Sequence, residues 1–179
     1  MYAFEPERSK YELLCKNIAS NKITNCLPLS VALSNEEGRV MLHLNLYSGE
    51  GYSVIANGHS WSGEQHEQYV VESNTLDAFC SINGVERLKL VRIDLEGAHF
   101  LVLQGADGML MNGKVDVVIC EAGINTHSIT GRTDQELFAF MSDLGYVPHL
   151  VVKDMLVEIS PLKSVPGAGG FCLCEQRAD

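Results

Sequence analysis

Acidic residues follow three short apolar runs in this sequence. Glu5 comes after "YAF" and Glu121 after "DVVIC", while Asp94 and Glu96 follow "LVRI". Ligands of an open α/β sheet bind beyond the carboxyl ends of its parallel strands, so we expect these acids to converge on one crevice. A carboxylate there could accept hydrogen bonds from hydroxyl groups or take a proton as a general base. The alternative is that each acid caps a neighbouring helix through first-turn N–H groups.

Two histidines near the same acids raise the alternative of a site for a divalent cation. His99 and His127 follow the second and third acidic strand ends, and imidazole with carboxylates can bind a divalent cation. No helical His/Glu spacing supports such a site, so the sequence favours no metal. His99 is either a polar first-turn helix residue or a side chain that faces the site. The six cysteines lack CxxC spacing and mostly lie in apolar runs, which predicts reduced core residues.

Strand and helix patterns that alternate along the chain must position these acids. A helix is expected from Pro6 onward, with an apolar stripe at Tyr11, Leu14 and Ile18. The helix expected at 133–144 carries a capping-box pattern, Thr133-x-x-Glu136. The expected helices are 7–21, 74–82, 100–111 and 133–144, and the expected strands are 2–4, 26–33, 40–47, 69–73, 87–97, 115–123, 146–152, 155–160 and 170–176. This order predicts a single α/β domain over residues 1–179 with a mainly parallel sheet.

The stretch Ser48–Gln68 carries no clear period. It is polar and glycine-rich and contains the only tryptophan, Trp61. A segment of this length is either functional or disordered. Its aromatic and imidazole side chains make it a candidate lid over a polyol ligand, and a plain surface loop is the alternative.

Composition limits the partners. With 179 residues and 46% hydrophobic content, the chain can form one proper core. A formal net charge of -10 argues against nucleic-acid binding, which needs clustered Lys and Arg. No apolar run approaches the roughly 20 residues of a membrane span, and no signal peptide is visible, so we expect a cytoplasmic location.

The segment "RIDLEGAH" at 92–99, followed by "LQGA" at 103–106, resembles the FkbM-type methyltransferases. Their pattern at this strand is lysine-aliphatic-aspartate-aliphatic-glutamate-glycine-alanine-glutamate, then a leucine and a glycine-alanine pair. Arg92 here replaces the lysine, and His99 replaces the second glutamate. The stretches "AFEPE", "VALSNEEG", "NTLDAF", "VICEAG" and "LGY" follow in the order of the family. The resemblance therefore extends over nearly the whole chain.

This resemblance implies an S-adenosylmethionine-dependent O-methyltransferase that acts on a hydroxyl of a sugar or small metabolite. It also implies a Rossmann-like class I sheet, mostly parallel with an antiparallel C-terminal edge. The acceptor would be a small molecule or glycan. The oligomeric state is left open, with a homo-oligomer as one alternative. The residues to which it assigns roles are Glu5, with Pro6 beside it, for the cofactor ribose; Ala32, Leu33 and Ser34 for the adenine; Asp94 for the methionine moiety; and Asp94, Glu96 and Glu121 for catalysis at the acceptor hydroxyl.

The family's glycine-rich cofactor turn has no counterpart in this sequence and would precede residue 1. We therefore expect the first strand-helix unit of the sheet to be missing. Three explanations are open: the reading starts downstream of the true gene start, the gene is a natural fragment, or a partner supplies the strand. Direct pairing of the "YAF" and "LVRI" strands would exclude the partner version. Two functional alternatives remain: a non-catalytic fragment or assembly module that does not bind the cofactor by itself, and a Rossmann-like domain for another nucleotide.

Overall fold

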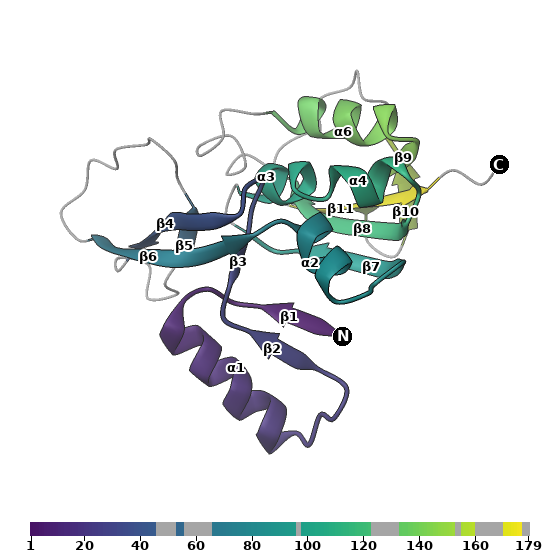
Figure 1. Cartoon of the computed structure of the whole chain (residues 1–179). Helices are drawn as coiled ribbons and strands as arrows, with labels where there is room; N and C mark the ends of the chain where they lie inside the picture. The colour runs from purple at the N-terminus through teal and green to yellow at the C-terminus, as the bar shows by residue number, and fades with distance from the viewer. Residues whose placement is uncertain are drawn as a thin grey trace.

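The computed structural model describes residues 1–45, 53–55, 66–95, 98–122, 133–152, 155–159 and 170–176. Strands in this part of the chain form three sheets, of five, four and two strands (Figure 1). The largest has the order β10-β9-β11-β8-β7. Its strands are β7 (Leu88–Ile93), β8 (Val115–Ala122), β9 (Tyr146–Val152), β10 (Met155–Glu158) and β11 (Gly170–Gln176).

Four short helices accompany this five-stranded sheet. Phe138 and Met141 of α6, Leu103 of α3 and Leu110 of α4 are almost fully buried and belong to one apolar core with Val118 of the sheet. Burial of a side chain of this size stabilises a fold by about 1.5–3 kcal/mol, so this core holds the largest unit together. The helices are α2 (Leu76–Ile82), α3 (His99–Gln104), α4 (Asp107–Met111) and α6 (Asp134–Asp143).

A second sheet has the order β3-β6-β4-β5. A smaller apolar cluster, which contains Ala32, Val40, Leu42 and Ala98, joins this sheet to the start of α3. The strands are β3 (Ala32–Leu33), β4 (Gly38–Asn45), β5 (Ser53–Ile55) and β6 (His66–Asn74).

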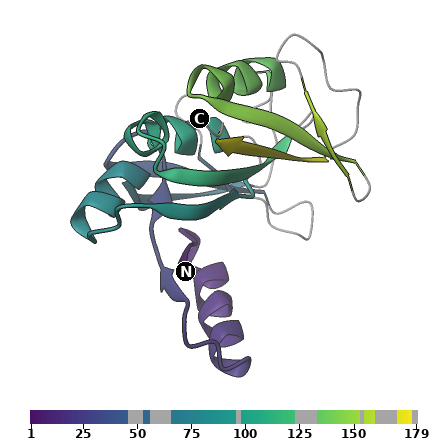
Figure 2. The ribbon, with the colours of Figure 1, turned by 90° about the vertical axis from the view of Figure 1, so that its right-hand side faces the viewer.

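The first 29 residues form a βαβ unit of β1 (Tyr2–Phe4), α1 (Arg8–Ser20) and β2 (Leu27–Leu29). Strands β1 and β2 pair in parallel, and none of the residues of α1 is buried. Both views show this unit set apart from the five-stranded sheet, with β1 on the side toward β7 (Figures 1 and 2). The rings of Tyr2 and Phe4 pack edge-on against Phe79 of α2, at centroid distances of 5.0 and 4.9 Å.

Strands β1 and β7 do not pair with each other, since they belong to different sheets. Within the described residues, each has a hydrogen-bonded neighbour on one side only: β2 for β1 and β8 for β7. The direct pairing that would have excluded a partner strand is therefore not observed. An unpaired edge leaves backbone donors and acceptors without a ladder.

The expected helices and strands are confirmed in most of the described chain, with four corrections. The stretch 48–68, which shows no clear period, contains β5 and the first residues of β6. The run 26–33 is not one strand, because it divides into β2 and β3, which lie in different sheets. The helix expected at 100–111 divides into α3 and α4 at Gly105. The sheets are not mainly parallel, since the described strands make three parallel and five antiparallel pairs. Each parallel pair needs a crossover connection, whereas the closing strands and β4, β5 and β6 are joined without one.

The antiparallel C-terminal edge is present as expected, with β9, β10 and β11 following β8. None of the helices in the described ranges has the length and apolar character that crossing a bilayer requires.

Candidate functional site

Glu5 lies directly after β1, where the chain turns into α1. Its Oε1 accepts a hydrogen bond of 2.9 Å from the backbone N–H of Glu7, and its own N–H donates to the carbonyl of Leu29 at 3.0 Å. Burial raises the pKa of the Glu5 carboxyl, although the Glu7 N–H and the charge of Lys10 act in the opposite direction. The backbone therefore holds this strand-end carboxylate at the carboxyl edge of the β1-β2 pair.

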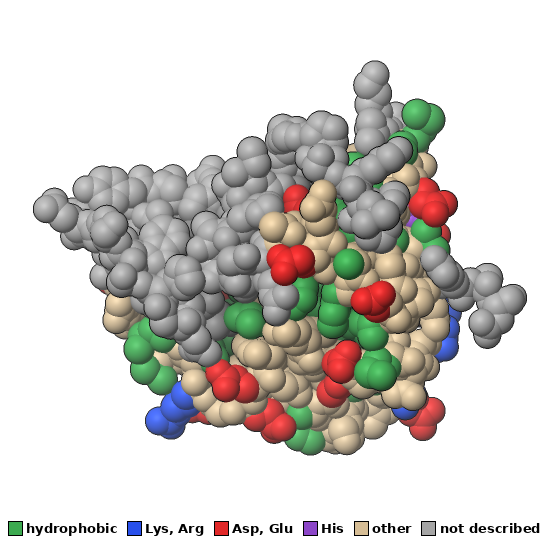
Figure 3. Space-filling view, turned by 90° about the horizontal axis from the view of Figure 1, so that it is seen from above, with side chains coloured by type: hydrophobic (Ala, Val, Ile, Leu, Met, Phe, Trp, Pro, Cys, Tyr) green, Lys and Arg blue, Asp and Glu red, His purple; other side chains and the backbone are tan. Residues whose placement is uncertain are grey.

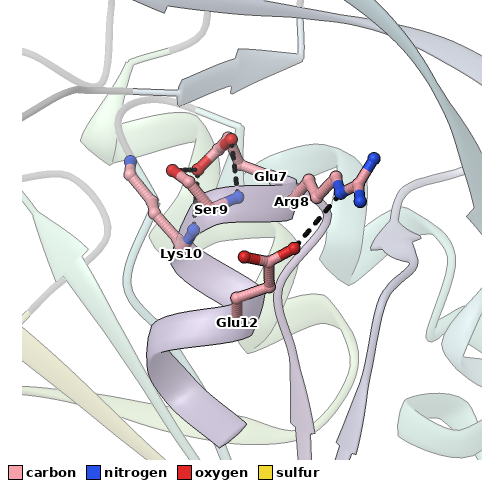
Figure 4. A network of polar contacts seen from close by, with 5 residues as sticks. All are labelled: Glu7, Arg8, Ser9, Lys10 and Glu12. Carbon is pink, nitrogen blue, oxygen red and sulfur yellow. Dashed lines mark hydrogen bonds and ion pairs between the residues drawn. The ribbon is translucent and has the colours of Figure 1, made fainter. Parts of the chain in front are cut away.

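The helix start next to Glu5 is capped by a different acid. Glu7 is the N-cap of α1, and its carboxylate accepts from the N–H groups of Ser9 and Lys10 at 2.9 and 2.8 Å (Figure 4). The Ser9 hydroxyl adds a third hydrogen bond of 2.6 Å. Burial raises the pKa of Glu7, but these hydrogen bonds outweigh it and leave the pKa lowered. The helix thus begins at Arg8, two residues beyond the expected Pro6, and Glu7 caps it.

Asp94 lies at the carboxyl end of β7. Its side chain is 52% exposed and accepts a hydrogen bond of 2.5 Å from Arg92, two residues earlier on the same strand. Strand β8 runs parallel to β7, and the paired register ends at Ile93 opposite Cys120. The next residues, Asp94 just after β7 and Glu121 near the end of β8, therefore lie at the same edge of the sheet.

The structure brings only part of the expected acidic set together. Pairing of β7 and β8 places Asp94 beside the backbone of Glu121, which itself pairs with Phe171 of β11. Glu5 stands at the end of β1, in a separate sheet. Glu96 and the side chain of Glu121 lie outside the described residues, as do most of the expected lid at 48–68 and His127.

Ala32, Leu33 and Ser34 form the end of β3. Ala32 is buried against the second sheet, and the Ser34 N–H donates to the carbonyl of Asn74 at 3.0 Å. Gly105, at the end of α3, packs directly on the backbone of Ser34. These three residues are therefore fixed between β6 and α3, in a sheet that contains neither β1 nor β7.

His99 is the first residue of α3, and its side chain is 4% exposed. Burial lowers the pKa of its imidazole, while the nearby Asp134 and a hydrogen bond to the backbone of Leu95 act in the opposite direction. Its Nδ1 is buried and has no hydrogen-bond partner among the described residues. His99 is thus a residue of the first helical turn, as one of its two interpretations has it, but it is buried; that it faces the site stays a prediction.

Asp134 was not expected among the functional residues. It is the first residue of α6, and only 9% of it is exposed. The expected capping box is confirmed around it: Thr133 accepts from the Glu136 N–H, and Glu136 accepts from the Thr133 N–H. The capping box predicts from the sequence where α6 begins. The burial of Asp134 is seen only in the fold.

Three cysteines lie on one buried face of the five-stranded sheet. Cys120 pairs with Cys172 across β8 and β11, and the sulfur atoms of Cys172 and Cys174 are 3.6 Å apart. Thiol hydrogen bonds from Cys120 and Cys174 lower the pKa of Cys172, whereas that of Cys174 is raised. All six cysteines are free, and four of them are buried, as expected. The described residues contain no cluster of three His, Cys, Asp or Glu side chains that could hold a metal ion.

Acidic side chains outnumber basic ones on the face seen from above in Figure 1. Figure 3 shows Asp and Glu scattered across the described part of this face, between apolar side chains and with few Lys or Arg. This distribution agrees with the net charge of -10 and does not offer a polyanion a continuous basic track.

Comparison with known proteins gives one match. Residues 1–148 fit the family model described as the methyltransferase FkbM domain. Neither a curated protein nor a solved structure matches the chain.

Proposed function

Because the chain belongs to the FkbM methyltransferase family, we propose that it transfers a methyl group from S-adenosylmethionine to a hydroxyl of a sugar or small metabolite. The family model covers residues 1–148, which include β1, β7 and β8 with their acidic ends. We further propose that these strands correspond to strands of the Rossmann-like sheet of class I methyltransferases. The protein would work in the cytoplasm on a small-molecule or glycan acceptor, with no nucleic-acid or membrane partner.

One observation supports this proposal most strongly. Asp94, just after β7, and Glu121, near the end of β8, each come one residue after the last pair in the register of these parallel strands. Ligands of α/β sheets bind at this edge, which supports a role for both acids toward one bound molecule.

Glu5 fits the polar end of the proposed cofactor. One of its oxygens is held by the Glu7 N–H, which fixes the carboxylate relative to β1. A carboxylate has about four lone-pair sites, so this geometry leaves capacity to accept from two neighbouring ribose hydroxyls. When bound, S-adenosylmethionine supplies a methyl group on a sulfonium that is already a good leaving group. Hydrogen bonds to a charged acceptor contribute about 1.5–3 kcal/mol each, so Glu5 would provide much of the affinity.

The acids at β7 and β8 would act on the acceptor. Asp94, held by Arg92, would border the reacting groups, and Glu96 and Glu121 would face the acceptor hydroxyl. A carboxylate within hydrogen-bond reach can take the hydroxyl proton as the oxygen attacks the methyl carbon. The remaining contribution is positioning, which can supply several kcal/mol of the barrier reduction.

Methyl transfer from isotope-labelled S-adenosylmethionine to a panel of monosaccharides and glycosides tests this function. We expect label in at least one acceptor and a loss of about 100-fold or more in the Glu121→Gln variant. Glu12→Gln, at an exposed ion pair on α1, is the matched control and should retain activity. Equal label incorporation by wild type and Glu121→Gln would refute the role of that acid.

A second function has one observation in its favour. Among the described strands, β1 and β7 each have one unpaired edge, which favours a methyltransferase-like module that does not bind the cofactor by itself. A two-stranded sheet alone is marginally stable, and none of the residues of α1 is buried, so the β1-β2 pair depends on contacts such as those of Tyr2 and Phe4 with Phe79. Absence of S-adenosylhomocysteine binding by a folded chain would support this module over the enzyme.

A further inference from the structure

Strand β10 forms one edge of the five-stranded sheet and exposes apolar side chains on both of its faces. Among the described strands, β9 is its only hydrogen-bonded neighbour. Met155, Leu156 and Val157 are 64%, 49% and 46% exposed, and Val151, which pairs with Leu156 on β9, is 44% exposed. Successive side chains of a strand point to opposite faces, so this edge presents apolar surface on each face of the sheet.

The backbone of β10 also directs hydrogen-bonding groups to its open side. Just beyond the strand, the Ile159 N–H donates to the carbonyl of Pro148 on β9 at 2.9 Å, which continues the β9-β10 register. Bonding residues alternate along an antiparallel strand, so Val157 bonds toward β9 like Ile159. Leu156 and Glu158 therefore direct their N–H and C=O groups away from β9, toward the side where no described strand lies.

Charge distinguishes this edge from the opposite edge of the same sheet. Charged side chains on an edge strand discourage pairing with another chain. Strand β7, at the far end of the strand order, carries Lys89 and Arg92. Strand β10 carries one charged residue, Glu158, at its last position. Of these two edges, β10 is thus the one that is suited to accept a further strand.

We propose that two copies of the chain associate through β10, with the two strands antiparallel about a two-fold axis at Val157. Such an interface is self-complementary, because each copy presents the same strand. Residues directly opposite each other across two antiparallel strands share a face, so Val157 lies opposite Val157 of the second copy, and Leu156 lies opposite its Glu158. The axis joins two five-stranded sheets into one.

The backbone directions favour this register. Leu156 and Glu158 are the residues of β10 whose N–H and C=O groups point outward, and an axis at Val157 pairs each of them with the other in both halves of the interface. An axis at Leu156 would leave Glu158 without a partner within β10. The chosen register also sets the charge of Glu158 opposite a leucine and not opposite a second carboxylate. The dimer is independent of the proposed function, since β7 lies at the other edge of the sheet.

Sedimentation of the purified chain over a series of concentrations tests the proposal. We expect a reversible rise in mass to twice the 19.7 kDa of one chain. Val157→Lys places two like charges directly opposite each other and should weaken the dimer by about 10-fold or more. Leu156→Lys makes the same charge change one residue away but places the lysine opposite Glu158, so its affinity should stay within about 5-fold of wild type. Ile82→Lys, at an exposed apolar residue of α2, is the control and should dimerise as wild type does.

Three results would overturn the proposal. A wild-type chain that stays monomeric at every concentration has no such interface. Undiminished dimerisation of Val157→Lys would place the interface elsewhere, and equal losses in Val157→Lys and Leu156→Lys would contradict the register.

If Val157→Lys does not fold, Leu156→Pro decides. Proline is tolerated on an edge strand where the N–H faces outward, so this change removes the outward donor and leaves the bonds to β9 in place. We expect the Leu156→Pro chain to keep its circular dichroism spectrum and to lose the dimer, and a retained dimer would contradict pairing through β10.

Discussion

Replacing Gly105 by alanine tests the contact that joins α3 to the end of β3. The φ of Gly105 is -74°, which any L-residue adopts, so the new methyl group meets no backbone strain. It would instead fall well inside van der Waals contact of the Ser34 carbonyl oxygen and 3.0 Å from the carbonyl carbon. Both are backbone atoms, and the Ser34 N–H is bonded to Asn74, so the neighbour cannot turn aside.

The magnitude follows from two opposing effects. A Gly→Ala change at a compatible φ stabilises a protein by about 0.4–1 kcal/mol through the unfolded chain. Overpacking costs about 1–3 kcal/mol and is near its upper limit when backbone must move. We therefore expect Gly105→Ala to lower the free energy of unfolding by about 2 kcal/mol, or the Tm by about 4–8 °C for a chain of this length.

Urea unfolding followed by circular dichroism measures this loss. Gly108→Ala is the matched control, because its methyl group would meet the Asp77 carboxylate at 2.8 Å, the movable end of a side chain. We expect a smaller loss of about 1 kcal/mol there, because the carboxylate can shift, although this lengthens its hydrogen bonds from the N–H groups of Gly108 and Met109. If Gly105→Ala is as stable as wild type, or no worse than Gly108→Ala, the close approach of α3 to Ser34 is wrong.

Three further predictions concern the caps, the core and the sheet edge. Glu7→Gln should cost about 1 kcal/mol at pH 7. Because folding lowers the pKa of Glu7, its contribution is present above the ordinary value of 4.5 and is lost as pH falls through the folded pKa, so unfolding curves of the two proteins should converge in acid. Tyr146→Phe removes the 2.6 Å hydrogen bond to the buried Val115 carbonyl and should lower the free energy of unfolding by about 1–3 kcal/mol. Burial raises the pKa of Tyr146 to about 12, so the ultraviolet titration of the variant should lack one phenol that ionises near that pH. Amides of Tyr2–Phe4 should exchange faster than those of Val118 and Cys120, and equal protection would contradict the position of β1 in a two-stranded sheet.

Local sequence patterns predicted most elements of this fold. The capping box at Thr133 and the period-2 pattern from Val40 depend on neighbouring residues only, and both are confirmed. The division of 26–33 into β2 and β3 has no local signal, because both halves are apolar and extended. It arises from the separate sheets that the two halves join.

The candidate site was predictable to a similar extent. Strand-end acids at Glu5 and Asp94 follow from pattern, and the parallel register places Asp94 next to Glu121. The sequence does not predict that His99 and Asp134 are buried, because both are polar residues at the start of a helix and such residues are usually exposed. Their burial depends on the packing of α3, α6 and β11, which lie far apart in the sequence.

Calorimetric titration of S-adenosylhomocysteine into wild type and Glu5→Gln tests the central claim most directly. The glutamine keeps an oxygen for the Glu7 N–H and removes only the charge, so the fold of the β1–α1 turn should persist. We expect micromolar binding by wild type and a loss of about 10- to 100-fold in Glu5→Gln, as for hydrogen bonds to a charged acceptor, with Glu12→Gln unchanged. Silence of the folded wild-type protein at millimolar ligand, or equal affinity of wild type and Glu5→Gln, would contradict the proposed cofactor site.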